Sequence, residues 1–484
     1  AAFAVRAEAE RARAERRFAE LRGLANTLLF DIHDRVERLA GSVEARREIV
    51  RTGLNYLDSL AAEAVDDPEL LDELAKAYAR IGAIQGNPFA SNLGDTDAAL
   101  ASFARSIEIR EQIERLTPGT LGNRLALART RISVADVATS AARAQDALDH
   151  YEQAAAMLEA MPDTELAVLD TLSFVYGRLG HTLRNMGRNE EALERFLLSL
   201  GFAERIMERD PESKDYRSVG VALNEAGQTL IRLGRPGEAR EYLERAMRIR
   251  AEAAANEPHD ARAQRDLALA HHRLADVYQA EDRLESTLGH NRAALELLAA
   301  LHAAAPTDAR ACLDESIALD KLGTTLRMLG RHEEALAMHR RVCELRDKLS
   351  EAQPDNMFYV MVQAAAFDQV AETLMMMGRH DEAREAFAAA VEASERGTRS
   401  GDNDTRLWST LAHAQRGMAD SLLADAAADP AGGAERRARA GEWLRACMDT
   451  LARMEERGIV PVRTDMNRAA IAALLAECEN AAGG

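Results

Sequence analysis

A phrase of eighteen residues occurs twice in this chain, as LGHTLRNMGRNEEALERF at 179–196 and as LGTTLRMLGRHEEALAMH at 322–339. Looser copies align on the ninth residue of the phrase, at positions 94, 142, 187, 234, 282, 330 and 378. The steps between these positions are 48, 45, 47, 48, 48 and 48 residues. Such a fixed period is typical of stacked two-helix units, none of which buries its apolar side alone.

Each recurring residue type in the unit has a physical role. One set of glycines leaves room for a neighbouring helix, and a second set can take the left-handed conformation that ends a helix. An alanine and, four residues later, a large apolar residue share one face of the second helix. A proline then stops that helix. The sets are Gly180, Gly227 and Gly323; Gly187, Gly234, Gly330 and Gly378; Ala147, Ala192, Ala239, Ala335 and Ala383; Tyr151, Phe196, Leu243 and Phe387; and Pro118, Pro162, Pro211, Pro258, Pro306 and Pro354.

Composition restricts both the fold and the partners. Aromatic residues make up 4% of the chain and alanine recurs throughout, which favours closely packed helices over a β-sandwich. The formal charge of −19 would repel a polyphosphate and argues against nucleic acid as a partner. Cys312, Cys343, Cys447 and Cys478 are too widely spaced for a zinc site. No eighteen consecutive residues are apolar, so we expect no membrane span in this segment.

In its order of Leu-Gly, Ala, aromatic residue and Pro, the unit resembles the tetratricopeptide repeat over roughly residues 70–395. The family unit has about 34 residues, whereas most units here have 48. The additional residues predict two helices that are each about seven residues longer. The resemblance implies an all-α fold, a right-handed superhelical solenoid of antiparallel helix pairs. HEAT and armadillo repeats are the alternative, but the Leu-Gly and Gly-Arg-x-x-Glu-Ala signals belong to neither.

The pattern divides the chain into four parts. We predict a charged spacer helix at 1–22, a degenerate first helix pair at 23–69, the repeat array at 70–395, and a degenerate repeat with capping helices at 396–484.

Three segments interrupt the pattern. Apolar residues between 18 and 39 follow nearly heptad spacing, which indicates either a dimer seam or a helix packed on the first repeat. The insertion QGNPFASNLGD at 85–95 presents Phe89, either in a loop folded over the first groove or as a contact for a ligand or partner. The stretch at 425–444, DAAADPAGGAERRARAGEWL, is predicted to be a flexible insertion.

Stacking turns the first helix of each pair toward the concave side, where a protein or peptide partner would bind. The outward positions that flank the Leu-Gly step are either groove contacts or simply solvated. They are His181, Arg184, Asn224, Gln228, His272, Asp276, Asp320, Thr324, Arg327, Asp368 and Glu372. In the family, a clamp of Lys and Asn reads a peptide's C-terminus, but only Asn224 matches it in kind. The groove is expected to be basic in its N-terminal repeats and acidic in its C-terminal repeats. Such a groove would suit a partner segment with charges of both signs.

No chemical motif accompanies the repeats. The sequence has no Gly-rich phosphate loop, no His-Glu-x-x-His and no nucleophile elbow. His272 and Asp276 lie four residues apart, and a surface hydrogen bond or a groove contact is favoured over a metal ion for this pair. We therefore expect no enzyme activity, no cofactor and no metal in this segment.

A narrower resemblance covers residues 15–105. The stretches RRFAELRGLANTLLFDIHDRVERLAGSVEARREIVRTGLNYLDSLAAEA and LAKAYARIGAIQGNPFASNLGDTDAALASF resemble the tail of bacterial membrane-anchored serine/threonine protein kinases. The resemblance implies a noncatalytic, extracytoplasmic sensing or docking tail behind a membrane helix. The arginines among residues 6–22 instead favour the cytoplasmic side, which leaves the side of the membrane open. The alternative is a free cytoplasmic scaffold or regulator that assembles other proteins.

Overall fold

The structure is a computed structural model that describes residues 42–61, 66–89, 92–210, 216–399, 404–428, 432–460 and 466–482, together with Val36. All secondary structure in these ranges is helical, without strands. The predicted spacer helix at 1–22 and, apart from Val36, the near-heptad segment at 18–39 lie outside the described residues.

The chain forms two compact units, which meet in sequence between Arg235 and Pro236. The first unit contains α3 (Val43–Ala61), α4 (Pro68–Gly86), α5 (Thr96–Leu116), α6 (Leu121–Ser140), α7 (Ala144–Glu159), α8 (Leu166–Asn185), α9 (Asn189–Arg209) and α10 (Tyr216–Arg232). The second contains α11 (Pro236–Asn256), α12 (Ala261–Ala280), α13 (Leu284–Ala304), α14 (Ala309–Met328), α15 (His332–Ala352), α16 (Met357–Met376), α17 (His380–Arg399), α18 (Thr405–Ala428), α19 (Gly433–Glu456) and α20 (Arg468–Ala482).

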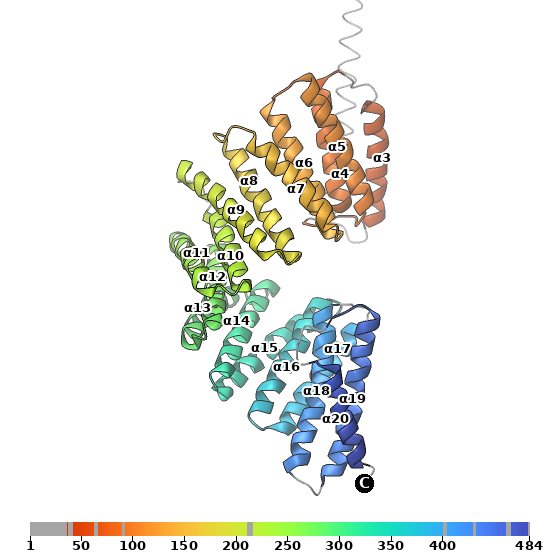
Figure 1. The fold of residues 1–484 in the computed structure, drawn as a ribbon, viewed down its shortest axis with the longest axis vertical. Helices are drawn as coiled ribbons and strands as arrows, with labels where there is room; N and C mark the ends of the chain where they lie inside the picture. Colours follow the sequence, from red (N-terminus) through yellow and green to blue (C-terminus); the bar gives the residue numbers. More distant parts are fainter. Residues whose placement is uncertain are drawn as a thin grey trace, which may run out of the picture. The chain divides into compact units, whose positions relative to one another are not determined.

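Within each unit, every helix packs on the next one along the chain (Figure 1). Most first helices of the pairs have 20 residues, as in α8, α12 and α14, and most second helices have 21, as in α9, α13 and α15. The predicted all-α fold of stacked, lengthened helix pairs is confirmed.

The turn inside each pair has the same backbone conformation in every aligned copy. Gly187, Gly330 and Gly378 have φ values of 79°, 75° and 70°, as predicted for residues that end a helix. Ala142 and Asp282 occupy the same position with φ values of 59° and 58°, although they are not glycines. The repeat therefore imposes the left-handed turn even where the residue type disfavours it.

The arginine that follows this turn starts the second helix. Arg188 Nε donates to Glu191 Oε1 at 2.7 Å, and Arg331 Nε donates to Glu334 Oε1 at the same distance. In both pairs the second guanidinium nitrogen bonds the other carboxylate oxygen, so each contact is bidentate. This contact explains why the phrase reads Gly-Arg-x-x-Glu.

The small and large residues of the pattern form the core between paired helices. Every predicted crossing alanine is fully buried, and so are Tyr151, Phe196, Leu243 and Phe387. A Cβ atom added to Gly180 would lie 2.6 Å from the Phe196 ring, so this glycine is required by packing.

One expectation for the C-terminal part is wrong. Instead of a flexible insertion at 425–444, the structure has α18 continuing to Ala428 and α19 beginning at Gly433. These helices bury Trp408, Leu444 and Cys447 in a core cluster of their own, which compensates for the missing repeat phrase.

Candidate binding surface

The first helices of the pairs carry all of the predicted groove residues. In each unit, we call the surface that these helices form its first-helix face: α6, α8 and α10 in the first unit, and α12, α14, α16 and α18 in the second. His181 and Arg184 lie on α8, and Asn224 and Gln228 lie on α10. The second unit holds His272 and Asp276 on α12, Asp320, Thr324 and Arg327 on α14, and Asp368 and Glu372 on α16.

Most of these side chains are less exposed than outward positions would be. Asn224, His272 and Asp368 are buried, and the other eight are half-buried. The reason is that successive first helices contact one another through polar side chains. The predicted groove residues were expected to point outward, but several of them contact a neighbouring first helix.

In the first unit, ion pairs link α6 to α8 and α8 to α10. Arg184 Nη1 lies 2.6 Å from Glu225 Oε2, and Arg178 Nε lies 3.4 Å from Asp136 Oδ1. His181 Nδ1 is 3.8 Å from the same Glu225 oxygen. Burial lowers the pKa of His181, which outweighs the attraction of Glu225 for the charged imidazole.

In the second unit, the same kind of pair recurs 45 residues apart. Lys321 Nζ on α14 donates to Asp276 Oδ1 on α12 at 2.8 Å. Arg327 on α14 donates to Glu372 on α16, and its Nη2 donates to Gln369 Oε1 at 3.0 Å. Asp276, Arg327 and Glu372, all predicted as partner contacts, therefore also hold neighbouring helices together.

Asp368, Glu372 and His413 form a polar cluster between α16 and α18 of the second unit. His413 Nδ1 on α18 lies 2.7 Å from Asp368 Oδ1, and its Nε2 lies 3.4 Å from Glu372 Oε1. One ligand atom from each residue lies within 4.8 Å of the others, as in a three-ligand metal site. However, Glu372 also pairs with Arg327, a cation beside the position that an ion would take. Arg327 and these three residues thus form one charge network that links α14, α16 and α18.

His272 belongs to a second buried polar network. Its Nδ1 lies 3.1 Å from Asn291 Oδ1 on α13, and Asn291 Nδ2 donates to Thr325 Oγ1 at 3.0 Å. Burial lowers the pKa of His272 to about 4; Lys321 and Arg273 nearby act in the same direction, against the Asn291 hydrogen bond and Asp276. The neutral imidazole donates to the amide and links three helices.

This lowered pKa predicts acid sensitivity of the second unit. An unfolded histidine has a pKa of about 6.5, so below that pH the unfolded chain binds a proton that the folded chain excludes until about pH 4. Stability should fall across this interval, by on the order of 3 kcal/mol from His272. The drop in thermal unfolding midpoint from pH 7 to pH 5 should be smaller in His272→Gln. An equal drop in both proteins would contradict the assignment.

Four exposed apolar residues on the first-helix face were missed at the sequence level. Phe174, Val221, Leu269 and Ile317 are 47%, 51%, 39% and 38% exposed. Each lies thirteen residues before the turn position of its own repeat, at 187, 234, 282 or 330. A comparison of this one position across the aligned repeats would have revealed the four residues.

Each unit has a cavity on this face. In the first unit, a cavity of about 330 Å³ lies between α8 and α10 and is lined by Phe174, Arg178, His181, Arg217 and Val221, among others. In the second unit, a cavity of about 500 Å³ is lined by methionines 328, 375 and 376 together with Arg327, Glu372, His413 and Asp420. Both combine apolar side chains with charged groups, as binding sites for peptides do.

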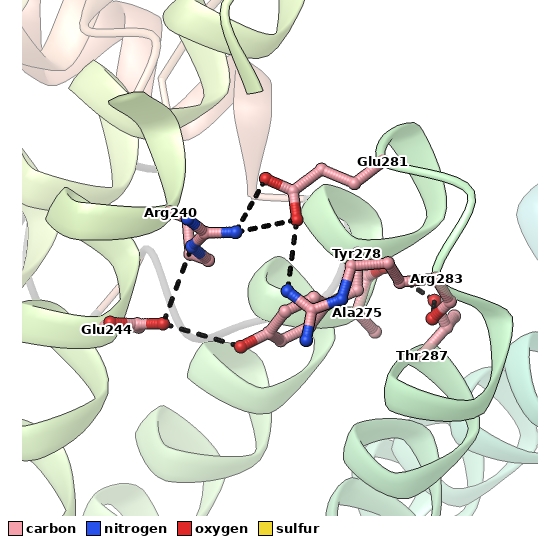
Figure 2. A network of polar contacts seen from close by, with 7 residues as sticks. All are labelled: Arg240, Glu244, Ala275, Tyr278, Glu281, Arg283 and Thr287. Atoms are coloured by element: carbon pink, nitrogen blue, oxygen red, sulfur yellow. Dashed lines mark hydrogen bonds and ion pairs between the residues drawn. The ribbon is translucent and has the colours of Figure 1, made fainter. Parts of the chain in front are cut away.

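Another polar network joins α11 to the end of α12 (Figure 2). Arg240 Nη1 bonds both Glu281 oxygens, at 3.0 and 2.9 Å, and Arg283 Nη1 lies 3.4 Å from the same carboxylate. Tyr278 donates to Glu244 at 3.4 Å, and the Arg283 guanidinium lies 4.5 Å from the Tyr278 ring centroid. These groups bind one another, so the network is structural.

The described residues offer no reactive thiol. All four cysteines are free and buried, and burial raises the pKa of Cys343 and of Cys447 to about 12. Among the described helices, none has the length and apolar character that crossing a membrane requires.

Comparisons with known proteins agree with the repeat pattern. Two tetratricopeptide-repeat family models match the chain, one at residues 171–252 and 218–293 and the other at 316–355. No curated protein matches. Tetratricopeptide repeats are generally noncatalytic and bind protein partners.

Solved structures with similar folds share little sequence with this chain. The apo form of RapI is 12% identical, with alignment over 90% of this chain and 99% of its own and a TM-score of 0.49. A tetratricopeptide repeat protein from Parabacteroides merdae is 15% identical over 72% and 98%, with a TM-score of 0.38. BtubC from P. vanneervenii is 19% identical over 53% and 92%, with a TM-score of 0.42. Tetratricopeptide-repeat models thus match residues 171–293 and 316–355 of this all-helical chain, and the period and turn geometry of these residues agree with that repeat.

Proposed function

We propose that this chain is a noncatalytic scaffold that binds a protein or peptide partner on the first-helix face. The proposal rests on the exposed apolar residue that recurs at one repeat position, in Phe174, Val221, Leu269 and Ile317. Single exposed apolar residues are common, but their recurrence on the same face of successive helices is typical of a surface that another chain covers.

The predicted groove residues take different parts in this proposal. Asn224, His272 and Asp368 are buried, so we assign them to holding the helices together. The half-buried residues lie on α8, α10, α12, α14 and α16, and in this proposal they supply polar contacts to a partner. They are His181, Arg184, Gln228, Asp276, Asp320, Thr324, Arg327 and Glu372.

Site-specific photocrosslinking tests the proposal. A photoreactive phenylalanine analogue placed at Val221 or at Ile317 should form covalent adducts with a protein partner in the source cell. The same analogue at Leu198, which is exposed on the second helix α9, is the matched control. Mass spectrometry of the adducts would identify the partner.

Adducts at Val221 and Ile317 but not at Leu198 would support the first-helix face as the binding surface. Equal yields at all three positions, or none at the two first-helix positions, would contradict it. Because all three residues are exposed, the substitutions should leave the fold intact.

We further propose that the scaffold is the sensing tail of a bacterial serine/threonine kinase, tethered outside the cytoplasm through a preceding membrane helix. A free cytoplasmic scaffold that assembles other proteins is the alternative. The gene sequence upstream of Ala1 separates the two, since a kinase domain and an apolar run of about twenty residues would support the tethered form. A dimer through the near-heptad segment at 18–39 is part of the same proposal, and analytical ultracentrifugation with and without residues 1–39 tests it.

A further inference from the structure

A histidine of α18 is held against two carboxylates of α16. His413 Nδ1 lies 2.7 Å from Asp368 Oδ1. An ionised carboxylate only accepts hydrogen bonds, so this contact requires a proton on Nδ1. The neutral ring then has its lone pair on Nε2, the nitrogen on the side of Glu372. Asp368 therefore fixes both the tautomer and the orientation of the ring, as carboxylates do for histidines that bind metal ions.

The other edge of this ring has the spacing of two ligands on one metal ion. His413 Nε2 lies 3.4 Å from Glu372 Oε1, which is long for a hydrogen bond to a carboxylate. Bonds from zinc to imidazole nitrogen and to carboxylate oxygen are about 2.0–2.2 Å long, so two such ligands of a tetrahedral ion lie about 3.3–3.5 Å apart. An ion can therefore bridge Nε2 and Oε1 at the observed spacing of α16 and α18.

Arg327 contacts the other oxygen of the same carboxylate. Its guanidinium pairs with Glu372 Oε2, whereas Oε1 faces His413. A hydrogen-bonding group on the second oxygen of a ligating carboxylate orients that carboxylate. Arg327 also places a positive charge near the ion, so we expect weaker binding than in a site surrounded by acidic residues only.

The cavity of about 500 Å³ in the second unit adjoins this position. Glu372 and His413 line it beside three methionines. The cavity provides a route from solvent to the buried imidazole. It also leaves room for water at the remaining coordination positions, as in zinc sites that keep an open position.

We propose that His413 Nε2 and Glu372 Oε1 bind a divalent transition-metal ion such as Zn²⁺, and that Asp368 is the residue that positions the imidazole. This combination of nitrogen and oxygen ligands suits zinc and similar metals, whereas Mg²⁺ prefers oxygen ligands alone. The bound ion links α16 to α18. His413 lies 45 residues after Asp368, so no short sequence motif marks the site. The inference is independent of the partner surface proposed above.

Hydrogen exchange of the full chain, with Zn²⁺ buffered at known free concentrations, tests the site. Peptides from α16 and α18 should exchange more slowly with zinc, because an ion bound only in the folded state stabilises the helices that hold it. Mg²⁺ at the same concentrations should have no effect. Because protection is measured peptide by peptide, zinc bound elsewhere on the chain does not obscure the result.

Variants of the protein identify the ligands. In His413→Asn, the amide can donate to Asp368 in place of Nδ1, but it has no counterpart of Nε2. The zinc concentration for half-maximal protection should rise at least about tenfold in His413→Asn and in Glu372→Gln. His259→Asn and Glu385→Gln are the matched controls, because both residues are exposed in the same unit, and both should respond to zinc like the parent. Each variant is compared with and without zinc, so a change in its basal stability does not affect the test.

Equal protection by Zn²⁺ and Mg²⁺ overturns the inference, and so does a zinc response like that of the parent in His413→Asn or in Glu372→Gln. Protection by zinc that is confined to helices other than α16 and α18 also overturns it. Since the measurement involves no partner, its failure leaves the crosslinking test at Val221 and Ile317 unaffected.

Discussion

Replacing His413 with leucine should reduce the free energy of local opening of α16–α18 by about 3 kcal/mol. His413 and Asp368 are buried, and the 2.7 Å contact between Nδ1 and Oδ1 provides the carboxylate with a donor from α18. The same imidazole lies 3.4 Å from Glu372. Leucine removes both contacts, so Asp368 loses its donor from α18 in a poorly hydrated region, where the loss of a carboxylate's partner is costly.

Hydrogen exchange with mass spectrometry is the appropriate measurement, because stacked repeats need not unfold in one step. Exchange should accelerate in peptides from α16 and α18. His259→Leu is the matched control, since His259 is exposed in the same unit, and it should exchange like the parent. The double variant Asp368→Leu/His413→Leu should recover much of the loss because the buried carboxylate that lost its donor is removed as well, while Glu372 keeps its ion pair with Arg327. A double variant as unstable as the single one would show that packing, not charge, is responsible.

Replacing Gly180 with alanine should destabilise the first unit by about 1–3 kcal/mol, although alanine is the better helix former. The added Cβ would lie 2.6 Å from Phe196, a ring that is itself fully buried between α8 and α9. Because that ring has no free space to move into, the two helices must separate or the ring must leave its preferred rotamer.

Gly201→Ala should change stability in the opposite direction within the same unit. No atom lies within 4 Å of the position that its Cβ would occupy, so the substitution should stabilise α9 by about 0.5–1 kcal/mol. Hydrogen exchange in α8 and α9 should therefore be faster in the first variant and slower in the second. The same direction of change in both would contradict the assignment of Gly180 to close packing.

The fold could be predicted from the sequence because its signals are local and recur. The left-handed turn at Gly187, the buried alanine at Ala192 and the ring at Phe196 lie within ten residues of one another, and each has one physical explanation. The same three features recur in successive repeats, which makes the pattern easier to recognise. The helices at 405–428 and 433–456 lack the phrase, and their sequence gave no indication of the partners that bury them.

The candidate site was harder to predict because its geometry depends on pairs of helices that are far apart in sequence. Asp368 looked like an outward residue, and its partner His413 lies 45 residues later, beyond the last recognisable copy of the phrase. The exposed apolar positions were difficult to recognise for a different reason. Phe174 and Ile317 are different residue types, so only their equivalent positions within the repeat relate them.

The polar contacts between successive first helices also restrict how such a protein can evolve. Each contact joins two different neighbours, such as Arg184 with Glu225 or Lys321 with Asp276. A recombination event that duplicated or exchanged a single repeat would place a half-buried charge against a surface with no complementary charge. The units are alike in backbone but not interchangeable, and their order along the chain is maintained by complementary side chains.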